Sequence, residues 1–124
     1  MKPHLHANIS AKQHGGKPED YVAIHEFIDH SKAAVADVRH RAMLHSAWGI
    51  YVVSQVFGNV ITNSDGKTVS TRDIAEEHVI QDLGFIPTME DWLKEMPIQP
   101  WMSGTRKTRQ VLSFNAPRAA VHID

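Results

Sequence analysis

Nine of the 124 residues are histidine and none is cysteine, and this combination sets the strongest limit on how the chain folds. Without cysteine the chain forms neither disulfide bonds nor thiolate metal sites, so its core depends on apolar packing. Any bound metal must therefore be held by nitrogen and oxygen. Seven of the histidines precede residue 46. Because imidazole is the commonest protein ligand of transition metals, the sequence indicates a polar site carried by the segments that build the core.

The bulk properties are those of one ordinary globular domain. The hydrophobic fraction is 42%, the charged fraction is 22%, and the net charge is −1 with histidine neutral. This balance gives no electrostatic reason to expect nucleic acid as a partner. The longest apolar run, residues 50–53, is far too short to span a bilayer, and the amino terminus does not have the pattern of a secretion signal. We therefore expect no membrane association and a cytoplasmic location, in a bacterial or a phage-infected cell.

Capping and turn residues predict a mainly α-helical fold. Residues 7–14 form a short helix that ends at two glycines, and Pro18 opens a second helix whose apolar stripe is Tyr21, Ile24 and Ile28. Ser31 caps a central helix of roughly 25 residues that ends at Gly58. This central helix is expected to be the core of a small bundle.

The second half of the chain predicts a hairpin followed by two helices. Residues 60–62 and 68–69 flank a turn that contains glycine, which is typical of a short β-hairpin. Ser70 caps a helix that reaches Leu83, and Thr88 caps a short helix over Glu90–Met96. The predicted fold is thus a small bundle of three principal and two short helices with a hairpin, forming one domain over residues 1–102. Residues 103–124 are expected to be an extended C-terminal arm, either a strand over 108–114, an arm on a partner, or disordered.

Three histidine–carboxylate pairs lie one helical turn apart, so each pair shares a helix face. The candidate metal ligands are His25, Asp29, Asp37, His40, His78 and Asp82. Packed helices bring such groups together on one pocket, and a set of imidazoles and carboxylates suits zinc, manganese, iron or nickel. The sequence leaves open whether His6 or His45 joins the site. The competing interpretation is that these pairs are ordinary helix-stabilising salt links.

Two arginines and a glutamate beside these pairs suggest a reaction. Arg41 and Arg72 are placed to steady an anionic small molecule, and Glu77 is a candidate general base. An open position on a metal ion acidifies bound water. These features predict a metal-dependent hydrolase that acts on a phosphate-containing substrate.

The central helix carries two histidines that cannot both face the same site, because five residues separate His40 from His45. A continuous helix places His40 on the face of Leu44 and Trp48. We therefore expect His40 to point inward and His45 to be less buried.

A non-enzymatic role is the alternative. Trp101 follows a terminated helix and has nothing obvious to pack against, and the C-terminal arm has a strand-like segment. This alternative is a phage-type structural, inhibitory or assembly protein that binds a protein partner through the Trp101 region and the arm. A homo-oligomer is an expected form of either role.

Three segments also resemble a family of small uncharacterised proteins. They are the stretch from residues 15–21 through residues 37–41, residues 63–66, and residues 72–78. The resemblance covers most of residues 6–102 and is to a domain of unknown function associated with bacteria, phages and environmental sequences. It implies no activity.

Overall fold

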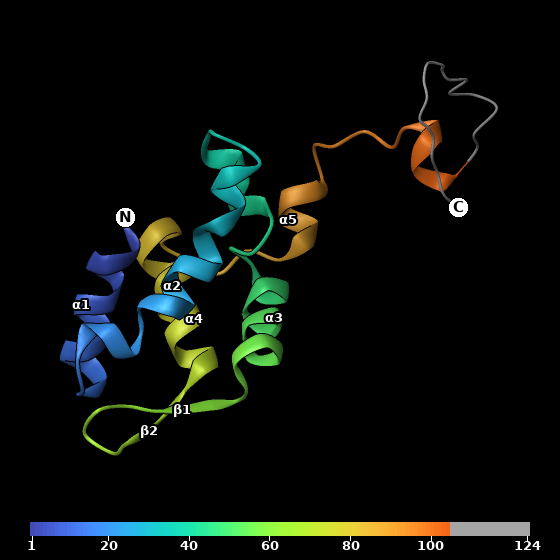
Figure 1. The fold of residues 1–124 in the computed structure, drawn as a ribbon. Coiled ribbons are helices and arrows are strands. Elements are labelled where there is room, and N and C mark those ends of the chain that lie inside the picture. Colours follow the sequence, from blue (N-terminus) through green and yellow to red (C-terminus); the bar gives the residue numbers. More distant parts are fainter. Residues whose placement is uncertain (105–124) are drawn as a thin grey trace, which may run out of the picture. The chain divides into compact units, whose positions relative to one another are not determined.

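The computed structural model describes residues 1–104 (Figure 1). Its compact part runs from Met1 to Leu93, and a second unit starts at Lys94. The first unit holds five α-helices and a two-stranded hairpin, so the predicted mainly helical fold with a short hairpin is confirmed. No helix in the described part of the chain is long and apolar enough to cross a membrane.

The first two helices follow the proline and glycine signals. Helix α1 spans Pro3–His14, with proline in its first turn, and ends at Gly15, whose φ is 86°. Residues Pro18–Asp20 form a single 3-10 turn, and helix α2 then spans Val22–Asp29. The helices run back against one another because two consecutive glycines with positive φ allow the chain to reverse between them.

The expected 25-residue central helix is wrong. Only Ala47–Phe57 form a helix there, α3, and the residues before it make two 3-10 helices, His30–Ala33 and Val38–Ala42. The Ser46 hydroxyl accepts a hydrogen bond from the Gly49 amide at 3.1 Å, so Ser46 is the N-cap in place of Ser31. The carboxylate of Asp37 accepts from the Arg39 amide at 2.9 Å and starts the second 3-10 helix instead.

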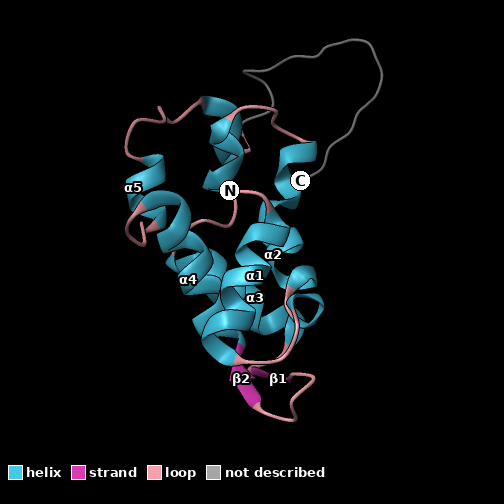
Figure 2. Cartoon of the chain, turned by 90° about the vertical axis from the view of Figure 1, so that its left-hand side faces the viewer, coloured by secondary structure: helices cyan, strands magenta, loops and turns pink. Residues whose placement is uncertain are grey.

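The hairpin and the helix after it lie where the sequence predicts them. Strands β1, Val60–Thr62, and β2, Thr68–Ser70, pair antiparallel with Ile61 opposite Val69 (Figure 2). Ser70 caps helix α4, Thr71–Leu83, by accepting from the Asp73 amide at 3.3 Å. A left-handed Gly84 ends α4.

Helix α5 is short and spans Met89–Leu93, ending before the predicted Met96. Thr88 and Asp91 cap it reciprocally, at 2.9 and 3.1 Å, as the sequence suggested. A 3-10 turn follows at Pro100–Ser103. The predicted strand over 108–114 and most of the expected C-terminal arm lie outside the described residues.

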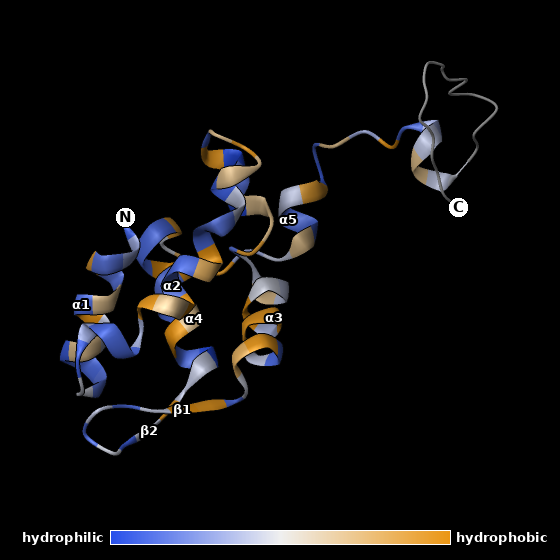
Figure 3. Cartoon of the chain, viewed as in Figure 1, coloured by the Kyte–Doolittle hydropathy of each residue, from blue (hydrophilic) through white to orange (hydrophobic). Residues whose placement is uncertain are grey.

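The core lies where α2 packs against α1, α3 and α4, and where α3 packs against α4 (Figure 1). In Figure 3, hydrophobic residues, drawn in orange, recur along α3 and in parts of α2 and α4. The buried apolar residues are Ala7, Tyr21, Ile24, Ile28, Ile50, Val53, Val69, Ile74, Ala75 and Val79. Several imidazoles and a carboxylate are buried with them, which requires that these polar groups find partners inside the protein.

Candidate metal centre

A cluster of four imidazoles and two carboxylates is assembled from separate segments of the compact unit. His6 lies on helix α1, and His25 and Asp29 lie on α2. His78 and Asp82 lie on α4. His45 directly precedes Ser46, the N-cap of α3. All four histidines are 0% exposed, and the side chains of Asp29 and Asp82 are 8% and 1% exposed. We call these six residues the His/Asp cluster.

The carboxylate of Asp82 is the hub of the cluster. Its Oδ2 lies 2.9 Å from His45 Nε2 and 3.3 Å from His78 Nε2. Its Oδ1 lies 3.2 Å from His6 Nε2 and accepts a hydrogen bond from the Met1 amine at 3.1 Å. Both oxygens are therefore engaged.

Asp29 faces the same nitrogens of His45 and His78 that Asp82 faces. Its Oδ1 is 3.3 Å from His78 Nε2 and 3.4 Å from His45 Nε2. The two imidazole nitrogens thus each face both carboxylates. A buried pair of carboxylates repels itself unless positive charge lies between or beside them, and the rings occupy that place.

The protonation of the cluster follows from these contacts. Burial alone would raise the pKa of Asp82, but hydrogen bonds from His45, His6 and His78 outweigh it and hold this pKa far below its usual range. Burial lowers the pKa of His78, but its hydrogen bonds to Asp29 and Asp82 raise that pKa above the ordinary value. Burial lowers the pKa of His25 to about 3. The cluster therefore holds ionised carboxylates, a His78 ring that favours the charged form, and a neutral His25.

Two sets of side chains within the cluster have the composition and spacing to hold a metal ion. One is His6, Asp29, His78 and Asp82, and the other is His6, His25 and His78; in each set the ligand atoms lie within 4.8 Å of one another. His45 is as close to the two carboxylates as His78 is. Nitrogen and oxygen ligands of this kind suit zinc and its first-row neighbours.

Two buried polar atoms beside the cluster have no hydrogen-bond partner among the described residues. They are Nε of Arg41 and Nδ1 of His45. The Arg41 side chain is 24% exposed, and its terminal nitrogen is 4.0 Å from Asp82 Oδ1. On the Arg41 side of the cluster, polar atoms without a partner among the described residues therefore lie next to a side chain that solvent partly reaches.

The structure brings four of the six predicted ligands together: His25, Asp29, His78 and Asp82. His40 is buried beside the cluster, with its ring edge-on to that of His45 at 6.0 Å, and burial lowers its pKa. Asp37 is not in the cluster. It is half exposed and pairs with Arg39 at 2.8 Å, because it is the N-cap of the second 3-10 helix and its carboxylate also accepts from the Arg39 amide.

Of the three predicted catalytic residues, only one lies at the cluster. Arg41 lies at the cluster, whereas Arg72 is exposed on the first turn of α4. Glu77 faces α1 and holds His14 Nε2 at 2.9 Å.

Sequence reasoning left two members of the cluster unassigned. His6 makes hydrogen-bond contacts with Gln81 and Asp82 on another helix, and no short-range spacing in the sequence predicts these contacts. His45 is fully buried, and the expectation that it would be less buried than His40 is wrong because that expectation assumed a continuous helix. The available signal for a helix start there was Ser46, which directly precedes an apolar segment.

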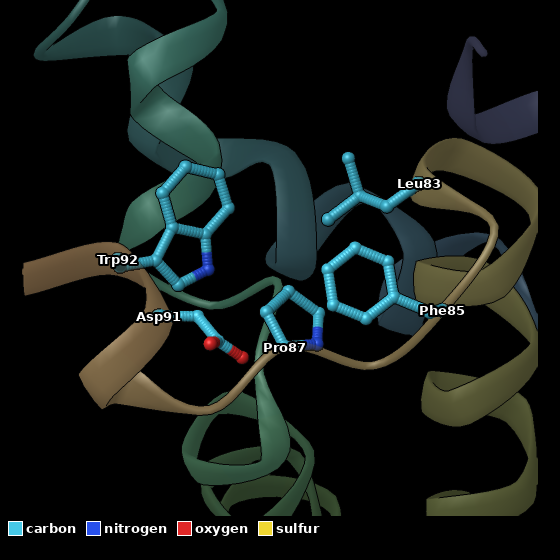
Figure 4. Close-up of a pocket in the computed structure, with 5 residues that line it drawn as sticks. All are labelled: Leu83, Phe85, Pro87, Asp91 and Trp92. Carbon is cyan, nitrogen blue, oxygen red and sulfur yellow. The ribbon is translucent and has the colours of Figure 1, made fainter. Parts of the chain in front are cut away.

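An apolar pocket lies between the end of α4, helix α5 and the loop that joins them. It is lined by Leu83, Phe85, Pro87, Asp91 and Trp92, and Pro87 lies between the two aromatic rings (Figure 4). The Trp92 indole nitrogen donates to the His45 carbonyl at 2.9 Å. Helix α5 therefore helps to fix the backbone of a cluster residue.

The chain belongs to a family described as a domain of unknown function (DUF6915), whose family model matches residues 1–102. No curated protein matches the chain. No solved structure matches it either. The family membership confirms the resemblance seen in the sequence and assigns no activity.

Proposed function

We propose that the His/Asp cluster binds a divalent transition metal ion. The ligands in this proposal are His78, Asp29 and Asp82, with His6 or His45 as the fourth. The observation that carries it is the spacing of the ring nitrogens and carboxylate oxygens, which is 2.9 to 3.4 Å for the contacts of His45 and His78. Four ligands about 2.1 Å from a tetrahedral ion lie about 3.4 Å from one another.

Charge supports the same proposal. Two ionised carboxylates in a buried site carry two negative charges, and in the metal-free protein the proton that His78 favours offsets part of them. A divalent cation would replace that proton on His78 Nε2, which lies 3.3 Å from one oxygen of each carboxylate. Metal ligands must be deprotonated, and the hydrogen bonds of His78 to Asp29 and Asp82 raise the pKa of that ring, so binding is expected to release a proton and to strengthen as pH rises.

The reaction that we propose is hydrolysis of a small phosphate-containing substrate. With four protein ligands, the ion would need a fifth coordination position for water; it would then supply an acidified water nucleophile and neutralise the two carboxylates, which would otherwise repel an anion. Arg41 would then hold the phosphate, because its unpaired Nε and its partly exposed side chain lie next to Asp82. Glu77 and Arg72 have no part in this proposal, since Glu77 holds His14 and Arg72 faces solvent.

The test of metal binding uses the full chain purified without a histidine tag. We expect about one equivalent of metal by elemental analysis, and a higher melting temperature on adding zinc, manganese or nickel, because a ligand of the folded state stabilises it by about 2.7 kcal/mol at a hundred times its Kd. Asp29→Ala should abolish both effects, whereas His14→Ala, which alters a histidine outside the cluster, should leave them intact. Less than about 0.2 equivalents together with no thermal shift would refute the proposal.

Hydrolysis is tested separately with the metal-loaded protein and p-nitrophenyl phosphate. Activity should depend on added metal and fall in Arg41→Gln. Metal binding without any phosphatase activity would refute the proposed hydrolysis but not the proposed metal centre.

A second candidate function is docking of a protein partner through the segment around Trp101. Its support is exposure, because Ile98 is 89% exposed and Trp101 is 51% exposed. We expect truncation after Met102 to change the oligomeric state or the capture of a partner. A monomer by light scattering both before and after truncation would count against self-association.

A further inference from the structure

A line of hydrogen bonds leads away from the carboxylates into the core. His78 Nε2 faces Asp29 Oδ1 at 3.3 Å, and the other nitrogen of that ring, Nδ1, lies 2.8 Å from His25 Nδ1. His25 Nε2 in turn lies 2.8 Å from Ser10 Oγ. The two rings are 0% exposed and Ser10 is 1% exposed, so water does not compete for any of these contacts.

Counting hydrogens leaves one arrangement once His78 Nε2 binds a metal ion. A neutral imidazole whose Nε2 is a ligand carries its hydrogen on Nδ1, so His78 must donate to His25. His25 then accepts at Nδ1 and carries its own hydrogen on Nε2. That hydrogen points to Ser10, whose hydroxyl oxygen accepts it. The neutral state of His25 that this arrangement needs agrees with its buried position.

Two other uses of these residues fit the geometry less well. Ser10 with His25 has the spacing of a nucleophile and its base, but a hydroxyl that is 1% exposed is out of reach of a substrate. His25 as a direct ligand would need its Nδ1 and that of His78 on one ion. Such an ion would lie at the Nδ1 edge of the His78 ring, away from Asp29 and Asp82, whose oxygens face Nε2 on the other edge.

We propose that Ser10 and His25 are positioning residues that fix the tautomer and the ring orientation of His78 in the metal centre. This inference rests on the proposed function for its consequence, although the contacts themselves exist without metal. Metal-bound imidazoles in general donate their second N–H to a nearby acceptor, and loss of that acceptor weakens binding or activity by roughly 10- to 100-fold. Here the acceptor is a second imidazole that is itself held by a hydroxyl, a role in which His25 needs no contact with metal or substrate.

The experiment compares zinc affinity across four variants, by competition with a chromophoric chelator. His25→Leu removes the acceptor and should weaken zinc binding by about 10- to 100-fold. His25→Asn places an amide oxygen near the Nδ1 position and should restore most of the affinity. Ser10→Ala should weaken binding by a smaller factor, and His14→Gln, on the same helix as Ser10 but outside the cluster, should bind as the wild type does.

A second measurement reports the tautomer directly. Long-range ¹H–¹⁵N spectra of the ¹⁵N-histidine-labelled, zinc-loaded protein should show His78 protonated at Nδ1, with a ring hydrogen that exchanges slowly in the wild type and in His25→Asn. In Ser10→Ala and His25→Leu it should exchange faster. The metal-free protein should show the same order of exchange rates among the variants. If His25→Leu does not fold, Ser10→Ala carries the test because it removes only a hydroxyl.

The outcomes separate the inference from the proposed function. If the wild type binds no zinc, the metal centre is refuted, and exchange of the His78 ring hydrogen in the metal-free protein decides the orienting role. If the wild type binds zinc and both His25→Leu and Ser10→Ala bind it equally well, the metal centre stands and the inference is overturned. Equal weakening by His25→Leu and His25→Asn would also overturn it, because that pattern indicates a ligand or a packing role.

Discussion

Replacing Asp82 by asparagine should cost much of the stability of the metal-free protein. The Oδ1 atom of Asp82 accepts from the Met1 amine and lies 3.2 Å from His6 Nε2, while its Oδ2 lies 2.9 Å from His45 Nε2. Asparagine has the same shape but only one acceptor oxygen. Whichever way its amide is turned, the NH₂ group faces at least one ring nitrogen or ammonium that had donated to a carboxylate.

The magnitude follows from burial. The Asp82 side chain is 1% exposed, so the lost contacts are not replaced by water. Removing one partner of a buried, charged hydrogen-bond network typically costs about 3–5 kcal/mol. That is a large share of the roughly 5–15 kcal/mol that stabilises a domain, and it corresponds to a fall in melting temperature on the order of 10–20 °C.

The assay is urea unfolding at pH 7 in the presence of a chelator. Asp37→Asn is the matched control because Asp37 is half exposed and pairs with Arg39 on the surface, where solvent screens the pair and its loss changes stability little. If Asp82→Asn unfolds at the same urea concentration as this control, the carboxylate is not the buried hub described above.

Two further predictions concern packing and pH. Gly49→Ala should destabilise the protein despite the better helix propensity of alanine, because a Cβ atom on Gly49 would lie 1.8 Å from the Leu44 carbonyl oxygen; a melting temperature equal to or above that of the wild type would contradict this. Acid should also destabilise the metal-free protein through His25, whose pKa is about 3 in the folded protein against an ordinary value of 6.5. The unfolded chain takes up a proton there that the folded chain does not, so this contribution is complete above pH 6.5 and declines as the pH falls towards 3. The check is urea unfolding at about pH 7, 5 and 4, where His25→Asn should lose less stability than the wild type; parallel losses would show that His25 is not the cause.

Local signals in the sequence predicted the elements that local interactions determine. Ser70 with Asp73 and Thr88 with Asp91 mark helix starts, and Gly84 marks a helix end, because capping involves residues three or four apart. The prediction of the central helix also depended on capping signals, and it was wrong. Two signals compete there, and the later serine, Ser46, is the one that caps a helix.

In the candidate site, too, the sequence predicted the short-range pairs and missed the long-range contacts. The pairs His25 with Asp29 and His78 with Asp82 were found because each lies within one helical turn. His6 was left open because its contacts with Gln81 and Asp82 join residues 75 and 76 positions apart. His40 is buried as predicted, but the prediction that His45 would be less buried was wrong, because a helical wheel applies only where the helix is continuous.

The origin of the cluster in four separate segments also bears on biosynthesis. A chain extended only as far as α3 contains His6, His25, Asp29 and His45 but lacks both α4 residues, His78 and Asp82. A complete ligand set exists only after α4 has left the ribosome and packed against α2. If the cluster holds an ion as proposed, an ion that uses His78 and Asp82 would therefore bind only after α4 has packed, and not to the part of the chain made before it.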